Sequence, residues 1–283
     1  MPRRRVSRRD LEAIADSLTE RQWAVLRSVA DHRFLTVDMI RRLHFAALSP
    51  ASSSRLTQKA LHRLRRDRLL GTLDRRIGGG ARGSSALVHY IDVVGYRLLD
   101  RQDGPTIRRH VKEPTETFLR HTLAVAETHL RLVEANRRDQ LELVHVEVEP
   151  RCWRGYTALG GTRWVKPDLY AETTIRRGSE DVDGWFIEVD LGSESIPRLL
   201  KKCHDYQAYE RTGIEQYGGD DPIAPQPFPA VIWTLTHRNL ATAERRRRAL
   251  RAAIAHDPRL DDALFHVIAP DQFITHITNG GHL

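Results

Sequence analysis

Three acidic residues lie in two apolar segments of this sequence, at spacings that suit a shared cation. Asp168 follows a Lys-Pro pair inside the apolar run 165–171, and Glu188 and Asp190 lie in the run 185–190, which reads as a buried strand. Residues two apart on a strand share a face, so Glu188 and Asp190 are predicted to point the same way. Acids on neighbouring strands can converge on one divalent cation through oxygen ligands. We therefore predict a site for Mg²⁺ or Mn²⁺ formed by Asp168, Glu188 and Asp190; the alternative is that these acids are solvated or paired with arginines.

Length and composition predict a cytoplasmic protein of two domains. The chain of 283 residues is long enough for two cores. Its two cysteines, Cys152 and Cys203, are too few for a disulfide framework or a four-ligand zinc site, which favours a reducing compartment. No apolar run approaches the ~18 residues of a membrane span, so no membrane partner is expected.

Charge is distributed unevenly along the chain. Residues 1–110 hold 23 Lys and Arg against 11 Asp and Glu, a net charge of +12. Residues 111–283 hold 22 Lys and Arg against 26 Asp and Glu, a net charge of −4. The basic excess therefore lies in the N-terminal part and indicates a module that meets a polyanion.

Three helices are predicted in this basic part. Thr19 and Gln22 have the spacing of a capping box before apolar residues at helical intervals, and Thr36 can cap a second, short helix. A Ser-rich loop at 49–54 precedes the third helix. Its outward positions are predicted to be Arg55, Gln58, Lys59, His62, Arg63 and Arg66.

Two paired strands follow these helices in the prediction. The apolar runs 69–73 and 86–91 flank a basic, Gly-rich tip that carries Arg75, Arg76 and Arg82. Three helices and such a hairpin make a winged helix-turn-helix, whose third helix enters the major groove of double-stranded DNA while the wing reaches the backbone. A winged helix used for protein contacts is the alternative interpretation.

A polar linker at 101–114 separates the two predicted domains, 1–110 and 111–283. The second domain is expected to contain, in order, a helix, three strands, a helix, a strand, a helix and a strand. The predicted fold class is thus α+β and α/β: a winged helix-turn-helix followed by an α/β domain with a central mixed sheet.

The order of elements in the second domain, with Lys166-Pro167-Asp168 and Glu188-Val189-Asp190 on its second and third strands, resembles the PD-(D/E)xK, or restriction-endonuclease-like, nuclease fold. With the N-terminal winged helix, the chain is similar to the replication-relaxation protein family of plasmids and mobile elements. The supporting residues are the run 89–96, the run 121–125, the run 186–190, Lys201 and Tyr206. The resemblance implies a role in replication and in the relaxation of plasmid DNA.

One position departs from the nuclease pattern. That pattern places a lysine two residues after the strand acid, where this chain has Asp190. Such a lysine stabilises the charge that develops on the phosphate, which a carboxylate does not do. Either Lys201 or Lys202 then reaches the site from the following helix, or the acids bind a metal without hydrolysis.

We therefore predict a DNA-binding protein of plasmid or mobile-element replication. One form of this hypothesis is that the protein is an Mg²⁺-dependent DNA-nicking endonuclease. The predicted catalytic residues are Asp168, Glu188, Asp190, Lys201 and Lys202. The alternative is a non-catalytic replication or transcription regulator, whose second domain forms a homodimer or binds replication or conjugation proteins.

Overall fold

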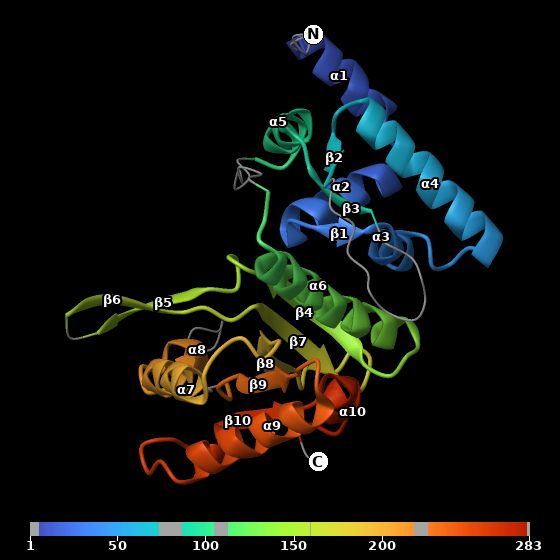
Figure 1. Cartoon of the computed structure of the whole chain (residues 1–283). Coiled ribbons are helices and arrows are strands. Elements are labelled where there is room, and N and C mark those ends of the chain that lie inside the picture. Colours follow the sequence, from blue (N-terminus) through green and yellow to red (C-terminus); the bar gives the residue numbers. More distant parts are fainter. Residues whose placement is uncertain (1–5, 74–86, 105–112, 159, 218–225, 282–283) are drawn as a thin grey trace. The chain divides into compact units, whose positions relative to one another are not determined.

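The computed structural model describes residues 6–73, 87–104, 113–158, 160–217 and 226–281. The chain divides into two units, residues 1–130 (unit 1) and 131–283 (unit 2), which are described separately (Figure 1). The division falls inside helix α6 (Glu116–Arg137), downstream of the boundary predicted at 110/111. Within the described ranges, no helix combines the length and the apolar character needed to cross a membrane.

Unit 1 combines helices with a small antiparallel sheet. Its elements, besides the first half of α6, are α1 (Arg8–Ser17), α2 (Glu20–His32), β1 (Leu35–Thr36), α3 (Val37–His44), α4 (Pro50–Arg66), β2 (Leu70–Thr72), β3 (Val88–Ile91) and α5 (Val93–Gln102). The strands are ordered β1-β3-β2, and both pairs are antiparallel. Helices α2, α3 and α4 followed by β2 and β3 reproduce the predicted order of elements. The predicted wing tip, with Arg75, Arg76 and Arg82, lies outside the described residues.

Side-chain caps fix where the helices of unit 1 begin. The Thr19 hydroxyl accepts a hydrogen bond from the Gln22 amide at 3.3 Å, and the Gln22 side chain accepts one from the Thr19 amide at 3.0 Å. Thr36 caps α3 by accepting from the Met39 amide at 3.1 Å. A further capping box at Ser7 starts α1, a helix that the sequence analysis did not predict. These reciprocal bonds satisfy amides that have no partner within the helix.

Helix α4 begins earlier than the sequence suggested. Pro50 occupies its first turn, where a missing amide proton costs nothing, so the serines at 52–54 lie in the helix and not in a loop. The helix buries residues spaced by three and four positions, which places one face on the core of unit 1. These buried residues are Ser53, Thr57, Ala60, Leu61 and Leu64.

Unit 2 is built on a five-stranded mixed sheet, as predicted. Its elements are β4 (Glu142–Val148), β5 (Arg154–Ala158), β6 (Gly161–Val165), β7 (Leu169–Thr174), β8 (Asp183–Asp190), α7 (Ile196–Glu210), α8 (Ile214–Tyr217), β9 (Ala230–Leu235), α9 (Leu240–Ala255), β10 (Phe265–Ile268) and α10 (Phe273–Thr278). The strand order is β10-β9-β8-β7-β4; β8, β9 and β10 are parallel, whereas β4 and β7 run antiparallel to their neighbours.

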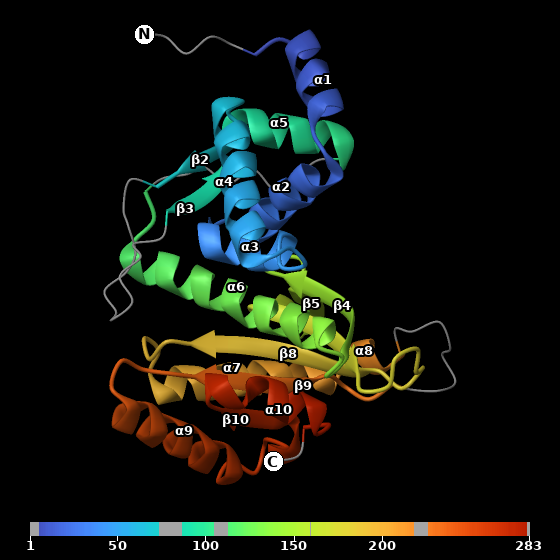
Figure 2. The same ribbon diagram turned by 90° about the vertical axis from the view of Figure 1, so that its right-hand side faces the viewer.

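Side chains along β8 point alternately to the two faces of the sheet, and this alternation sets which residues face the helices. Phe186 lies 5.6 Å, between ring centroids, from Tyr206 of α7, so the face that carries Phe186 also carries Glu188 and Asp190. Helices α7 and α9 cover this face (Figure 2). Trp185 projects to the other face, where its ring contacts His276 of α10.

Buried histidines should make unit 1 sensitive to acid. Burial lowers the pKa of His129 to about 4 from its usual 6.5. The unfolded chain takes up a proton on His129 near pH 6.5, whereas the folded chain does so only near pH 4. The contribution of neutral His129 to the free energy of unfolding is therefore complete above about pH 6.5 and is lost as the pH falls toward 4. Between pH 7 and pH 5, we expect the unfolding free energy of wild type to fall by about 2 kcal/mol more than that of His129→Gln, since one pKa unit corresponds to about 1.4 kcal/mol. Urea unfolding at both pH values measures it, and equal pH dependence in variant and wild type would contradict it.

Candidate active site

The register between β7 and β8 brings two buried carboxylates together. Leu169 pairs with Ile187, so Asp168, one residue earlier, stands opposite Glu188 on the antiparallel neighbour. The Asp168 amide donates to the Ile187 carbonyl at 3.1 Å, and its Oδ2 accepts from the Val189 amide at 2.8 Å. Asp168 is 9% exposed and Glu188 is 2% exposed. The structure thus brings Asp168 and Glu188 into one cluster.

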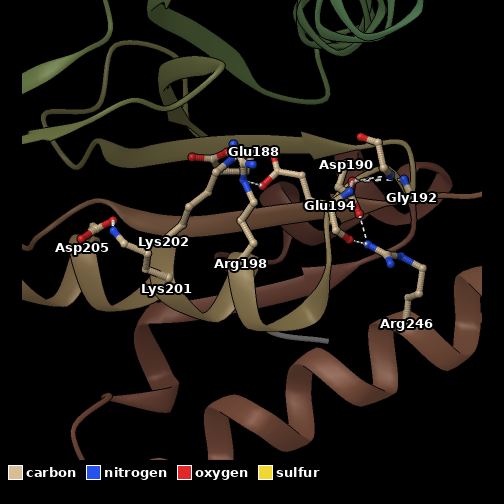
Figure 3. Close-up of polar contacts among 10 residues, drawn as sticks. Glu188, Asp190, Gly192, Glu194, Arg198, Lys201, Lys202, Asp205 and Arg246 are labelled. Atoms are coloured by element: carbon tan, nitrogen blue, oxygen red, sulfur yellow. Dashed lines mark hydrogen bonds and ion pairs between the residues drawn. The ribbon is translucent and has the colours of Figure 1, made fainter. Parts of the chain in front are cut away.

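Helix α7 supplies a lysine and a tyrosine to Glu188. Lys202 and Tyr206 are four residues apart and share one side of the helix. Lys202 Nζ lies 3.1 Å from Glu188 Oε2, and the Tyr206 hydroxyl donates to Glu188 Oε1 at 2.8 Å. Lys201 instead pairs with Asp205 at 2.8 Å, and its side chain is 74% exposed. Of the two predicted lysines, only Lys202 reaches the acids in this structure (Figure 3).

A further acid, Glu194, belongs to this cluster and was not predicted. Its Oε1 accepts from Lys202 Nζ at 3.2 Å, and its Oε2 lies 3.1 Å from Arg198 Nε. Glu194 lies in the polar turn before α7, where an acid is usually solvated. The one signal in the sequence is that Glu194, Arg198 and Lys202 recur at intervals of four residues.

Asp190 shares the face of Glu188 but contacts a different set of groups. Its Oδ2 lies 2.6 Å from the Arg246 guanidinium of α9, and its Oδ1 accepts from the amides of Gly192 and Ser193 at 3.1 and 3.2 Å. Arg246 also donates to the Glu194 carbonyl at 2.6 Å. Gly192 has a positive φ of 86°, which glycine adopts without strain. Asp190 and Arg246 therefore fix the turn that carries Glu194 (Figure 3).

Burial and the neighbouring charges shift the pKa values of Glu188 and Lys202. Burial raises the pKa of Glu188 to about 7; the charge of Lys202 opposes this shift and that of Asp168 reinforces it. Burial alone would lower the pKa of Lys202, but Glu188, Glu194 and Asp168 outweigh it and raise that pKa above its usual value. Lys202 therefore stays charged, and a second cation would stabilise the ionised acids.

This donor set fits a hard divalent cation. Within the ranges that the structure describes, no three His, Cys, Asp or Glu side chains form a group that could hold a metal. Magnesium often binds proteins through one or two carboxylates and completes its shell with water and substrate phosphate. Asp168 and Glu188 supply two such carboxylates, next to a lysine that remains charged.

The residues predicted to bind DNA do not all lie on one exposed face of α4. Arg55, Gln58, Lys59 and His62 are exposed. Arg63 is half-buried and donates to the Ser17 carbonyl at 2.6 Å, so it ties α4 to α1. Arg66 is exposed and pairs with the adjacent Asp67 at 2.9 Å.

These features define the class of the protein: an N-terminal unit of helices on a small antiparallel sheet, joined to an α/β unit with a buried carboxylate–lysine cluster. A family model described as replication-relaxation matches residues 26–220. The chain belongs to the replication-relaxation family, which confirms the resemblance seen in its sequence.

Two further comparisons add little to this assignment. No curated protein matches the sequence. Among solved structures, the restriction endonuclease FokI aligns with a TM-score of 0.26 and 10% sequence identity, covering 93% of this chain and 44% of that one. The chain thus spans less than half the length of FokI, and a likeness at this level carries no argument about activity.

Breaking the Asp190–Arg246 pair should destabilise unit 2. Arg246→Met would leave Asp190, which is 5% exposed, without its cation, and such changes cost about 3–5 kcal/mol. The double variant with Asp190→Asn should recover part of this stability. Arg245→Met is the matched control, because Arg245 is exposed and should change stability by less than about 0.5 kcal/mol. Urea unfolding measures all three, and equal destabilisation by Arg245→Met and Arg246→Met would contradict the assignment.

Proposed function

We propose that this protein binds DNA through unit 1 and cleaves a phosphodiester bond in unit 2, as a metal-dependent nicking endonuclease acting in the replication or relaxation of plasmid DNA. The observation that carries the proposal is the position of Lys202. Its Nζ, delivered by α7, lies 3.1 Å from the buried Glu188 beside Asp168. This lysine takes the role of the strand lysine of the nuclease pattern, whose position Asp190 holds in this chain.

Each member of the cluster has a distinct role in the proposed reaction. Asp168 and Glu188 would hold Mg²⁺ or Mn²⁺. When bound, such a cation makes water more acidic and stabilises negative charge on the phosphate. Lys202 adds a fixed positive charge for the developing phosphorane. Tyr206 donates to Glu188 and holds its carboxylate in place, and we assign Asp190 to the turn and not to the metal.

Unit 1 supports the DNA-binding half of the proposal. The exposed side of α4 carries Arg55, Gln58, Lys59 and His62, and residues 1–110 hold the basic excess of the chain. In a winged helix-turn-helix, the third helix presents such side chains to bases and phosphates in the major groove. The partner is therefore double-stranded DNA.

A non-catalytic role is the second candidate, and one observation favours it. Both oxygens of Glu188 and one oxygen of Asp168 already have protein partners. A cluster neutralised by Lys202 and Tyr206 is also what a structural platform for replication proteins, or a homodimer, would contain. The two candidates differ in whether DNA is cleaved.

Substitution of the cluster should abolish nicking of supercoiled plasmid DNA. With Mg²⁺ or Mn²⁺, we expect Asp168→Ala, Glu188→Ala and Lys202→Met each to lower the nicking rate about 100-fold or more, because each removes a metal ligand or a cation that stabilises the transition state. Lys201→Met is the matched control and should nick like wild type, since Lys201 contacts only Asp205 among these residues. If wild-type protein binds DNA but fails to nick it with either metal, that result would favour the non-catalytic role.

Duplex binding should depend on the exposed side of α4. We expect the double variant Arg55→Ala, Lys59→Ala to bind duplex DNA more weakly and to lower the slope of log affinity against log salt by about 0.9 for each phosphate that the protein no longer neutralises. The control Arg245→Ala, Arg248→Ala removes the same charge from the exposed side of α9. Fluorescence anisotropy at several salt concentrations measures both. Equal effects of the two double variants would remove α4 as the DNA-contacting helix.

A further inference from the structure

The β5–β6 hairpin and its flanks form a basic segment of unit 2 without acidic residues. Residues 151–167 include Arg151, Arg154, Arg163 and Lys166 and no Asp or Glu, although acids outnumber basic residues across 111–283. Arg154 is neutralised by Glu147 at 2.9 Å and Glu215 at 3.0 Å. Within the described ranges, neither Arg163 nor Lys166 forms an ion pair, and both are exposed. A polyanion is the partner that matches this surface.

The two faces of the hairpin differ in chemistry. One face packs on α7, where the rings of Tyr156 and Tyr209 lie 5.3 Å apart. The strand pairing places Trp164 opposite Gly155, and Thr162 opposite Thr157, on the other face. Trp164 is exposed by 52%, and Thr157 and Thr162 beside it are exposed as well. Figure 1 shows the hairpin extending beyond the five-stranded sheet of the same unit.

Trp164 has the geometry of a stacking platform. A Cβ placed on Gly155 would lie 3.1, 3.2 and 3.2 Å from three adjacent atoms of the indole six-membered ring. Such nearly equal distances show that one face of the ring lies over Gly155, since an edge would present one atom much closer than the others. The glycine lets the indole lie against the backbone, and half of its surface faces solvent.

The platform is fixed at a short distance from the acid cluster. Trp164 precedes Asp168 by four residues, which span at most about 14 Å between Cα atoms. The Cys152 thiol donates to the Pro167 carbonyl at 3.1 Å, and Lys166 Nζ lies 4.5 Å from the centroid of the Trp153 ring. These contacts hold the connecting segment, so a group bound at Trp164 keeps a defined separation from Asp168.

We propose that this hairpin binds single-stranded DNA, with an unpaired base stacked on Trp164 and a neighbouring phosphate held by Lys166, two residues further along the same face. Stacking on an aromatic side chain requires an unpaired base whose face is accessible, and duplex DNA does not present one. A peptide partner fits less well, because Gly155, Thr157 and Thr162, which share the face of the indole, are small residues that offer little apolar side-chain surface. The inference deepens and rests on the proposed function, since it names the form of DNA presented to the same acid cluster.

The test measures binding of the full-length protein to a fluorescent oligothymidylate, in EDTA and at several salt concentrations. We expect Trp164→Ala to weaken binding about tenfold, because one stacked base contributes roughly 1–3 kcal/mol and 1.4 kcal/mol corresponds to a factor of ten. Trp164→Phe should retain most of the affinity, and Lys166→Gln should lower the salt dependence. Affinity for a duplex of equal length should not change with Trp164→Ala.

Tyr217→Ala is the matched control, since Tyr217 is a 60% exposed aromatic residue of the same unit. Equal affinity of Trp164→Ala, Tyr217→Ala and wild type for the oligonucleotide would overturn the proposal. The proposal would also be overturned if Trp164→Ala changed the protein from dimer to monomer and left oligonucleotide binding unchanged. Trp164 would then be a contact between two copies of the chain. Because no metal or cleavage is involved, absence of nicking would count against the proposed catalysis and not against this surface.

Discussion

The antiparallel pairing of β7 with β8 is the constraint on which the rest of unit 2 depends. Its register sets Asp168 opposite Glu188 inside the protein, where two ionised carboxylates would repel one another. Buried charges persist only when hydrogen bonds and opposite charges compensate their loss of hydration. The Val189 amide, Tyr206 and Lys202 provide that compensation, and the last two arrive on adjacent turns of α7. The position of α7 on the sheet is therefore tied to the charge of the cluster.

The ion pair between Asp190 and Arg246 connects β8 to α9. Arg246 binds both the Asp190 carboxylate and the Glu194 carbonyl, and the amides of Gly192 and Ser193 complete the turn. That turn connects β8 to α7, so its shape sets where the first turns of α7 begin. Two acids on one face of a strand thus serve two purposes: Glu188 joins the cluster with Asp168 and Lys202, and Asp190 holds the connection that delivers the lysine.

Local patterns predicted the elements of the fold better than the partners of the acids. The capping residues Thr19 and Thr36 set helix starts that the structure reproduces, and the period of two along β8 correctly placed Glu188 and Asp190 on one face. The sequence left Lys201 and Lys202 as equal candidates, because one residue rotates a helix by about 100° and only the docking of α7 on the sheet decides which lysine faces inward. The role of Arg246 could not be predicted either, because it lies in a run of four arginines and only the docking of α9 decides which of them faces Asp190. The β5–β6 hairpin was missed since its strands carry Gly155, Gly161 and polar residues on an exposed face, and so lack an apolar alternation.

The central claim is that Asp168 and Glu188, with Lys202 beside them, form a metal-dependent catalytic centre. A crystal soaked in Mn²⁺ tests it most directly, because the anomalous signal of the ion locates it without reference to activity. The account predicts an anomalous peak in contact with a carboxylate oxygen of each acid at about 2.1 Å, close to the distance typical of octahedral Mg²⁺ sites, and no such peak in Glu188→Gln. Carboxylates that keep their present protein contacts in saturating Mn²⁺, with no peak between them, would contradict it.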